Sequence, residues 1–264
     1  PIYQFLSPLA GYVSGWNYWY VWVVTCMAEI TAVGVYVHLW LPDLPQWISC
    51  LVALGLMTCA NLFSVKAYGE FEFWFALIKV VTIIFLIFTG VGMIVFGLGN
   101  DGIPVGISNL TAHGGFLPHG IGGVFDTMLM VLFAYVGIEI IGVTAGEAAD
   151  PEKNLSAAID KVLYRILLFY VLALLIIMSI YPWNQLGHQG SPFVMVFEKL
   201  GITAAGHVIN FVVITAALSS CNSGIYSTGR MLYNLSLQGK APKMFSAVSS
   251  NKVPYKALGV SVVF

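Results

Sequence analysis

Long apolar stretches that contain no charged residue constrain this chain more than any other feature. Four of them run from Leu44 to Val65, from Val80 to Asn100, from Ile166 to Phe197 and from Gly201 to Gly229. Each is long enough to supply the roughly 20 residues that a helix needs to cross the core of a bilayer. Lipid allows only helices and closed barrels to span it, and these stretches are far longer than barrel strands. The sequence therefore predicts an all-α integral membrane protein whose main partner is the lipid bilayer.

Composition argues against the alternative of a very hydrophobic soluble fold. Hydrophobic residues make up 59% of the chain and charged residues 9%, whereas a soluble domain carries about 25% charged residues. The net charge of −1 suggests no nucleic-acid partner. The four cysteines lie in apolar stretches without metal-ligand spacing, so the sequence indicates neither a metal site nor a cofactor.

The apolar pattern divides into six complete spans and the start of a seventh, all within a single transmembrane domain, 1–264. The six spans are expected at about 11–38, 47–65, 73–98, 121–144, 162–183 and 204–229, and the seventh begins near Pro254. The chain starts at Pro1 and stops at Phe264 inside an apolar run. We therefore expect a fragment that is incomplete at both ends.

The basic residues predict the orientation of the spans, because cytoplasmic loops carry an excess of Lys and Arg. Of the eleven basic residues, Lys79 falls inside a span and Lys199 in an opposite loop. The other nine fall in the loops after the second, fourth and sixth spans, or at the span ends that adjoin these loops. They are Lys66, Lys153, Lys161, Arg165, Arg230, Lys240, Lys243, Lys252 and Lys256. The loops at about 66–72, 145–161 and 230–253 are therefore predicted to be cytoplasmic.

Three charged residues stand out deep inside the spans, namely Glu29, Lys79 and Glu139, whereas Asp126 is expected close to the external interface. A charge at the bilayer centre costs roughly 2.5–3.5 kcal/mol on insertion scales, so each one needs a reason. For Lys79 two interpretations are open. Its long side chain can snorkel towards the interface, or its ammonium group can lie in a cation-like site and exchange a proton during a transport cycle.

Two further groups of residues also allow two interpretations each. Gly137 lies beside Glu139 in the fourth span, where a glycine either permits close helix packing or marks a break in the helix. A break would free backbone groups to bind a small zwitterion, as discontinuous helices do in many transporters. Small polar residues in the sixth span, Ser219, Ser220 and Ser223, either allow close packing or line a polar site.

Several strings of residues resemble those of a known family. They are GWNYWY at 15–20 with Ala28-Glu29, AGEAADPEK at 145–153, SGIYSTGRMLY at 223–233 and GKAP at 239–242. These strings are similar to bacterial amino-acid permeases of the amino acid–polyamine–organocation (APC) superfamily. GVTA at 142–145 and YPWN at 181–184 suggest the branch that resembles proline and threonine/serine permeases.

The resemblance implies a LeuT-like fold of twelve helices in two inverted repeats, of which this chain would hold helices three to eight and the start of nine. It also implies functional residues. The substrate-binding residues would be Phe133, Ala134, Tyr135, Gly137 and Glu139. Lys79 would take the place of a sodium ion and couple transport to protons, and Ser219, Ser220 and Ser223 would line that cation-like site.

The leading hypothesis is uptake of a small neutral amino acid across the bacterial inner membrane, coupled to protons. An exchanger or facilitator on the same fold is the alternative. A membrane-embedded enzyme is the least favoured hypothesis, because no HExxH, GxSxG, paired Asp cluster or phosphate-binding loop is found among the spans. The sequence does not indicate the oligomeric state.

Overall fold

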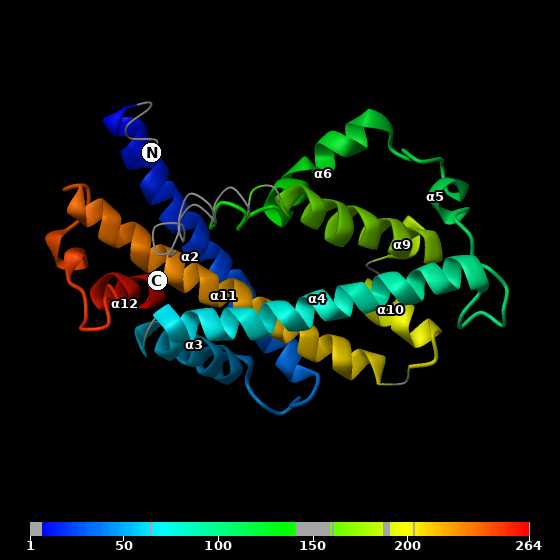
Figure 1. Ribbon diagram of the computed structural model, residues 1–264, viewed down its shortest axis with the longest axis horizontal. Helices are drawn as coiled ribbons and strands as arrows, with labels where there is room; N and C mark the ends of the chain where they lie inside the picture. The colour runs from blue at the N-terminus through cyan, green and yellow to red at the C-terminus, as the bar shows by residue number, and fades with distance from the viewer. Residues whose placement is uncertain are drawn as a thin grey trace. The chain divides into compact units, whose positions relative to one another are not determined.

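The computed structural model describes residues 7–63, 65–140, 159, 161–186, 191–202 and 204–263. In these residues the secondary structure consists of helices joined by turns and loops, without a strand (Figure 1). The chain forms two compact units, the first from 1–79 and 210–264 and the second from 80–209. Two long helices, α4 (Val65–Phe96) and α11 (Ala205–Leu237), contribute residues to both units.

Five helices of the described part are long enough and apolar enough to cross a membrane. They are Pro8–His38, Gln46–Phe63, Tyr68–Phe96, Lys161–Ile180 and Ala205–Leu237. A shorter apolar helix covers Gly120–Leu132. Because every backbone group must find a partner within lipid, uninterrupted helices of this length suit a membrane interior.

Two helices extend beyond the spans expected from the sequence. The segment 66–72, expected as a loop, is helical because α4 begins at Val65. The segment 230–237 is helical as well, because α11 continues to Leu237. Charged residues end the apolar pattern at these places, but they are good helix formers and neither segment contains proline. Helix α11 stops only near Gly239, whose φ of +70° suits a residue just beyond a helix end.

The first unit contains most of α11, from Asn210 to its end at Leu237. Helices α2 (Pro8–His38) and α3 (Gln46–Phe63) belong to it, as do the first part of α4, η4 (Lys243–Ser246) and α12 (Tyr255–Val263). In the most apolar 18-residue stretch of α11, 61% of the residues are buried, against 28–33% in the other four long helices. Helix α11 is therefore the most enclosed of the long helices.

Helix α2 begins at Pro8, ahead of the first span expected at about 11–38. Ser7 precedes it, and its side-chain oxygen accepts a hydrogen bond from the backbone N–H of Ala10 over 3.1 Å. Pro8 follows in the first turn, where its missing N–H is no loss. Further along, α2 lies close to α11, since a Cβ added to Gly224 would collide with the sulfur of Cys26.

The second unit contains the remainder of α4 and shorter helices. These are α5 (Asn109–Ala112), α6 (Gly120–Ala134), the π-helix η2 (Leu167–Leu172), α9 (Ala173–Ile180), η3 (Trp183–Gln185) and α10 (Pro192–Lys199). The amide of Asn109 donates to the carbonyl of Ser179 over 2.8 Å, which joins α5 to α9. The Tyr181 hydroxyl donates to the carbonyl of Met195 over 3.0 Å and joins the end of α9 to α10.

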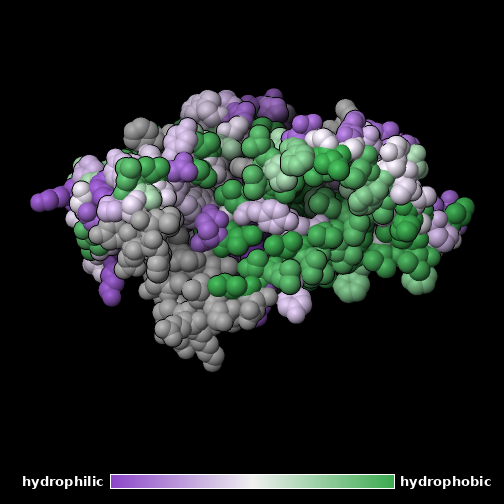
Figure 2. All heavy atoms as spheres, turned by 90° about the horizontal axis from the view of Figure 1, so that it is seen from above, coloured by the Kyte–Doolittle hydropathy of each residue, from purple (hydrophilic) through white to green (hydrophobic). Residues whose placement is uncertain are grey.

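Large apolar side chains cover much of the surface that Figure 2 shows. Phe88 is 73% exposed, Leu129 78% and Met130 77%. In water such exposure would be unfavourable, at about 25 cal/mol for each Å² of apolar surface. In a bilayer the same side chains face hydrocarbon, so this surface fits a membrane protein.

Candidate functional site

Lys79 of α4 makes a hydrogen bond that reaches α11 in the first unit. Its Nζ donates to Oγ of Ser219 over 2.8 Å. The Ser219 hydroxyl in turn donates to Oε1 of Glu72 over 2.7 Å. The Ser223 hydroxyl donates to Oε2 of the same carboxylate over 3.3 Å. Two serines of α11 therefore connect an ammonium group and a carboxylate that both belong to α4.

Helical periodicity explains why these four side chains meet. Glu72 and Lys79 are seven positions apart, about two turns, so they lie on the same face of α4. Ser219 and Ser223 are four positions apart and share a face of α11. Both serines are buried, with exposed fractions of 2% and 8%. Their small side chains allow the two helices to approach closely while still offering hydroxyl groups.

Glu29 brings a second carboxylate to this group from α2. It is half-buried, forms a hydrogen bond with Ser220 and lies within electrostatic reach of Lys79. Because Ser219 and Ser220 are consecutive, one turn of α11 contacts charged groups from two different helices. We call the six residues the Lys79 cluster: Glu29, Glu72, Lys79, Ser219, Ser220 and Ser223. With all three charged residues ionised, the cluster carries one positive and two negative charges.

Two buried asparagines join three helices, and one of them, Asn222, lies between Ser220 and Ser223 in the sequence. The Asn61 amide of α3 donates to Oδ1 of Asn222 of α11 over 2.8 Å. The Asn222 amide donates to the backbone carbonyl of Tyr68 of α4 over 3.4 Å. Asn222 is fully buried and Asn61 is 5% exposed. These bonds hold α3 and α4 against the helix that carries the serines.

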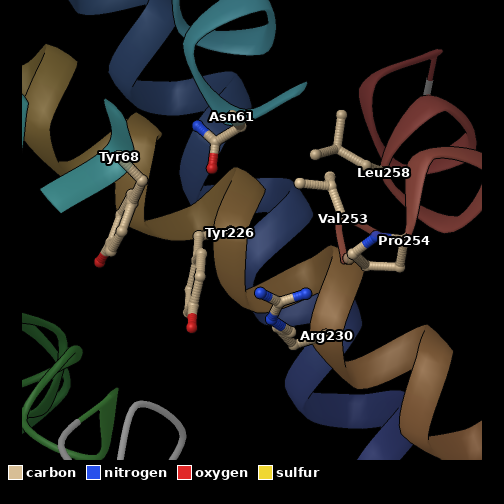
Figure 3. A pocket seen from close by; sticks show the side chains of 8 residues that line it. Asn61, Tyr68, Tyr226, Arg230, Val253, Pro254 and Leu258 are labelled. Atoms are coloured by element: carbon tan, nitrogen blue, oxygen red, sulfur yellow. The ribbon is translucent and has the colours of Figure 1, made fainter. Parts of the chain in front are cut away.

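An aromatic and cationic stack lines a small pocket one to two turns further along α11 (Figure 3). The rings of Tyr68 and Tyr226 are stacked, with centroids 4.3 Å apart and planes at 11°. The guanidinium group of Arg230 lies 5.0 Å from the centroid of the Tyr226 ring. Arg230 also donates to the backbone carbonyl of Lys252 over 3.2 Å. This stack ties α4 and α11 to the segment before α12.

In the second unit, the fourth expected span is interrupted directly after α6. Helix α6 ends at Ala134, and residues 135–139 form turns in place of helix. Gly137 has a φ of +104°, a conformation that only glycine adopts readily. The Gly137 N–H donates to Oε2 of Glu139 over 2.9 Å. Gly137 was expected either to permit close helix packing or to mark a break in the helix. The described backbone is broken at Gly137.

Tyr170 packs against this break from η2. Its ring stacks on that of Tyr135, with centroids 5.1 Å apart and planes at 14°. Its hydroxyl donates to the backbone carbonyl of Ala134 over 3.3 Å, one of the carbonyls that a helix end leaves without a helical partner. A π-helix within an α-helix frequently marks a functional position. Tyr170 therefore joins the residues of the break as a candidate site residue.

The structure brings together most of the residues singled out in the sequence. Lys79, Ser219 and Ser223 meet around Glu72, and Ser220 meets Glu29. Ala134, Tyr135, Gly137 and Glu139 form the break. Phe133 lies in the last turn of α6, but its side chain is outside the described part, as are 141–144 of the fourth span, the AGEAADPEK string and most of the expected 145–161 loop.

Sequence reasoning missed Glu72 and Tyr170. Glu72 was assigned to the 66–72 loop, although its spacing of seven from Lys79 places both on one face of a continuous helix. That spacing was the available signal. For Tyr170 no comparable signal exists, because a tyrosine in an apolar run gives no indication of a π-helix.

The sequence profile of the amino acid permease family matches residues 2–264. The chain belongs to the amino acid permease family. It is 61% identical over 255 residues to an uncharacterized amino acid permease, YtnA, of Bacillus subtilis (strain 168), covering 97% of this chain and 55% of that protein. It is 54% identical over 252 residues to a probable threonine/serine transporter, YbxG, of the same organism, covering 96% of this chain and 54% of the relative.

A third relative is a D-serine/D-alanine/glycine transporter of Escherichia coli (strain K12). It is 46% identical over 259 residues, which is 98% of this chain and 55% of that protein. The chain thus spans about half the length of the relatives it matches. The resemblance to bacterial amino-acid permeases and the helical membrane fold are confirmed. The family and these relatives are described as permeases and transporters rather than enzymes.

Proposed function

We propose that the permease containing this sequence takes up a small neutral amino acid across the bacterial cytoplasmic membrane in symport with protons. The observation that carries the proposal is the hydrogen-bonded chain from Lys79 through Ser219 to Glu72. An ionisable group inside a membrane span calls for a functional explanation. The contact of the ammonium group with a buried serine favours a cation-like site over snorkelling towards the interface.

The charge of Lys79 provides two states that a proton gradient can bias. When Lys79 is protonated, its ammonium group offsets one of the two carboxylates and holds α4 to α11 through Ser219. When Lys79 has lost its proton, that attraction is gone and the contact between the helices weakens. A gradient that favours one protonation state on each side of the membrane shifts the population of the two arrangements.

The names of two relatives support a small neutral substrate. One is described as a probable threonine/serine transporter and another as a D-serine/D-alanine/glycine transporter. The break after α6 offers suitable groups, because a backbone that leaves the helix exposes N–H and carbonyl groups to a zwitterion. In this proposal Ala134, Tyr135, Gly137 and Glu139 contact the amino acid. Phe133 or Tyr135 covers its side chain.

Uptake by the complete permease in lipid vesicles tests the proposal. Radiolabelled serine, threonine, alanine and proline are offered with and without an imposed proton gradient, to the unmodified protein and to Lys79→Ala. We expect the unmodified protein to accumulate one or more of them only with the gradient. Lys79→Ala should accumulate at least ten-fold less amino acid than the unmodified protein, while still exchanging external for internal amino acid.

A lysine outside the Lys79 cluster supplies the matched control. Lys243 is exposed on η4, so Lys243→Ala should accumulate the amino acid as the unmodified protein does. Normal accumulation by Lys79→Ala would contradict the role of Lys79. Flux that needs internal amino acid but no gradient would instead identify an exchanger.

A further inference from the structure

We infer that Glu72 receives the proton that Lys79 releases, and that the Ser219 hydroxyl carries it between them. This inference rests on the proposed symport and adds the route by which the proton leaves. Glu72 would then be a coupling residue in its own right, beyond its hydrogen bonds to two serines.

The directions of the hydrogen bonds suit such a transfer. Lys79 donates to Oγ of Ser219 over 2.8 Å, and the same hydroxyl donates onward to Glu72 over 2.7 Å. A hydroxyl that accepts from one group and donates to the next can pass a proton along without moving its oxygen. Ser219 is only 2% exposed, so this path lies inside the protein. The Ser223 hydroxyl holds the other oxygen of Glu72 and fixes the acceptor in place.

The step balances in atoms and charge. An N–H bond of Lys79 breaks and its proton goes to Oγ of Ser219, while the Ser219 proton goes to Oε1 of Glu72. The products are a neutral amine, an unchanged serine and a neutral carboxylic acid. The Lys79 cluster carries one cation and two anions before the step and the single anion Glu29 after it. Its net charge is unchanged, so the step adds no further net charge to the low-dielectric interior.

Two other titratable groups lie near Ser219, but neither accepts the hydrogen bond that would carry the proton away from it. Glu29 faces the cluster from α2 and is engaged by Ser220, the serine next to the one in the path. Cys221 of α11 lies near Glu29 and is fully buried. The hydrogen bond that the Ser219 hydroxyl donates ends on Oε1 of Glu72.

The position of Glu72 gives the transfer a direction. It lies seven residues nearer the start of α4 than Lys79, which corresponds to about 10 Å along a helix axis. The basic residues predict that this end of the helix faces the cytoplasm. A proton that moves from Lys79 to Glu72 therefore moves towards the cytoplasmic side, as uptake requires.

The test compares Glu72→Gln with Glu70→Gln in the complete permease. Glutamine keeps the size of residue 72 and one acceptor oxygen but cannot take a proton. Glu70 is exposed on the same helix, so Glu70→Gln is the matched control. We expect Glu72→Gln to exchange amino acid at a rate within about two-fold of the unmodified protein. Its gradient-driven accumulation should be at least ten-fold lower than that of the unmodified protein, while Glu70→Gln should match the unmodified protein in both.

Infrared difference spectroscopy supplies a measurement that a purely structural role would not change. As the proton moves, the unmodified protein should gain the C=O stretching band of a protonated carboxyl group, and Glu72→Gln should lack this band. Ser219→Ala should lose both the band and the accumulation. The inference would be overturned by any of three results with Glu72→Gln. The band could persist, accumulation could equal that of Glu70→Gln, or exchange could be lost together with accumulation. If the unmodified protein shows no gradient-driven accumulation, the proposed symport itself fails.

Discussion

Asn222 is a fully buried polar residue that links three helices of the first unit. It accepts a hydrogen bond from Asn61 over 2.8 Å and donates one to the Tyr68 carbonyl. A buried polar group that loses its partner costs about 1–3 kcal/mol, more than the net value of the bond itself. The alignment of α3 and α4 against α11 therefore depends on this side chain.

Replacing Asn222 with alanine should lower the stability of the permease by about 1–3 kcal/mol, because the Asn61 amide keeps its bond to the Met57 carbonyl but loses the acceptor of its other N–H. Thermal unfolding in detergent measures the effect. The matched variants are Asn61→Ala and the double variant. The double variant should cost clearly less than the sum of the two single ones, since it leaves no unpaired amide behind. Additive losses would contradict a direct coupling between the two asparagines.

At the level of single residues, the sequence predicts part of the candidate site. The family resemblance identified Lys79 and the serines of α11, and a spacing of four already places Ser219 and Ser223 on one face. Glu72 was missed because charged residues end an apolar pattern, which made a helical segment look like a loop. The partners of Asn222 depend on how three helices pack, and no local pattern contains that information.

At the level of elements, the interruption after α6 matters most. Helix α6 ends at Ala134 and Gly137 has a φ of +104°. The sequence contained the signal for this break, a glycine next to a charged residue in an apolar span. It did not contain the π-helix that places Tyr170 against the break, because π-helices follow from the packing of neighbouring turns. Helix α4 also begins eight residues before the expected third span, and α11 ends eight residues after the expected sixth span.

Gly137→Ala tests the importance of the break. A side chain in this positive-φ conformation costs about 1–3 kcal/mol, so the backbone should shift towards a helical path. We expect amino-acid binding to weaken at least ten-fold, measured by scintillation proximity with the radiolabelled substrate. Gly122 lies within α6 with open space around its Cα, and Gly122→Ala should bind normally. Equal binding by both variants would show that the substrate does not use the break.

At the level of the whole molecule, the apolar surface fits a membrane protein, and the placement of the basic residues predicts which loops face the cytoplasm. Among the described residues, five apolar helices are long enough to span a membrane. Nine of the eleven basic residues fall in every second loop between the expected spans, or at the span ends that adjoin these loops. The sequence sufficed for the class of fold because hydrophobicity and helix length are local properties. The packing of α11 as the most enclosed long helix is a property of the assembled unit.

Cysteine labelling tests the predicted orientation. In a variant without native cysteines, Lys243→Cys should react with a membrane-impermeant maleimide only from the cytoplasmic side, because the 230–253 segment carries the basic residues. Phe116→Cys should react only from outside, since it lies exposed in a loop of the opposite set. Labelling of both from the same side would contradict the proposed topology.

We propose above that an amino acid and a proton cross the membrane together, and that Lys79 binds and releases the proton. This proposal is tested most directly by recording proton flux with a pH-sensitive dye inside vesicles that contain the complete permease, after addition of serine without an imposed gradient. We expect the interior to acidify as serine enters, and Lys79→Ala to show neither acidification nor net entry of serine. Entry of serine at an undiminished rate without any proton flux would contradict the proposal.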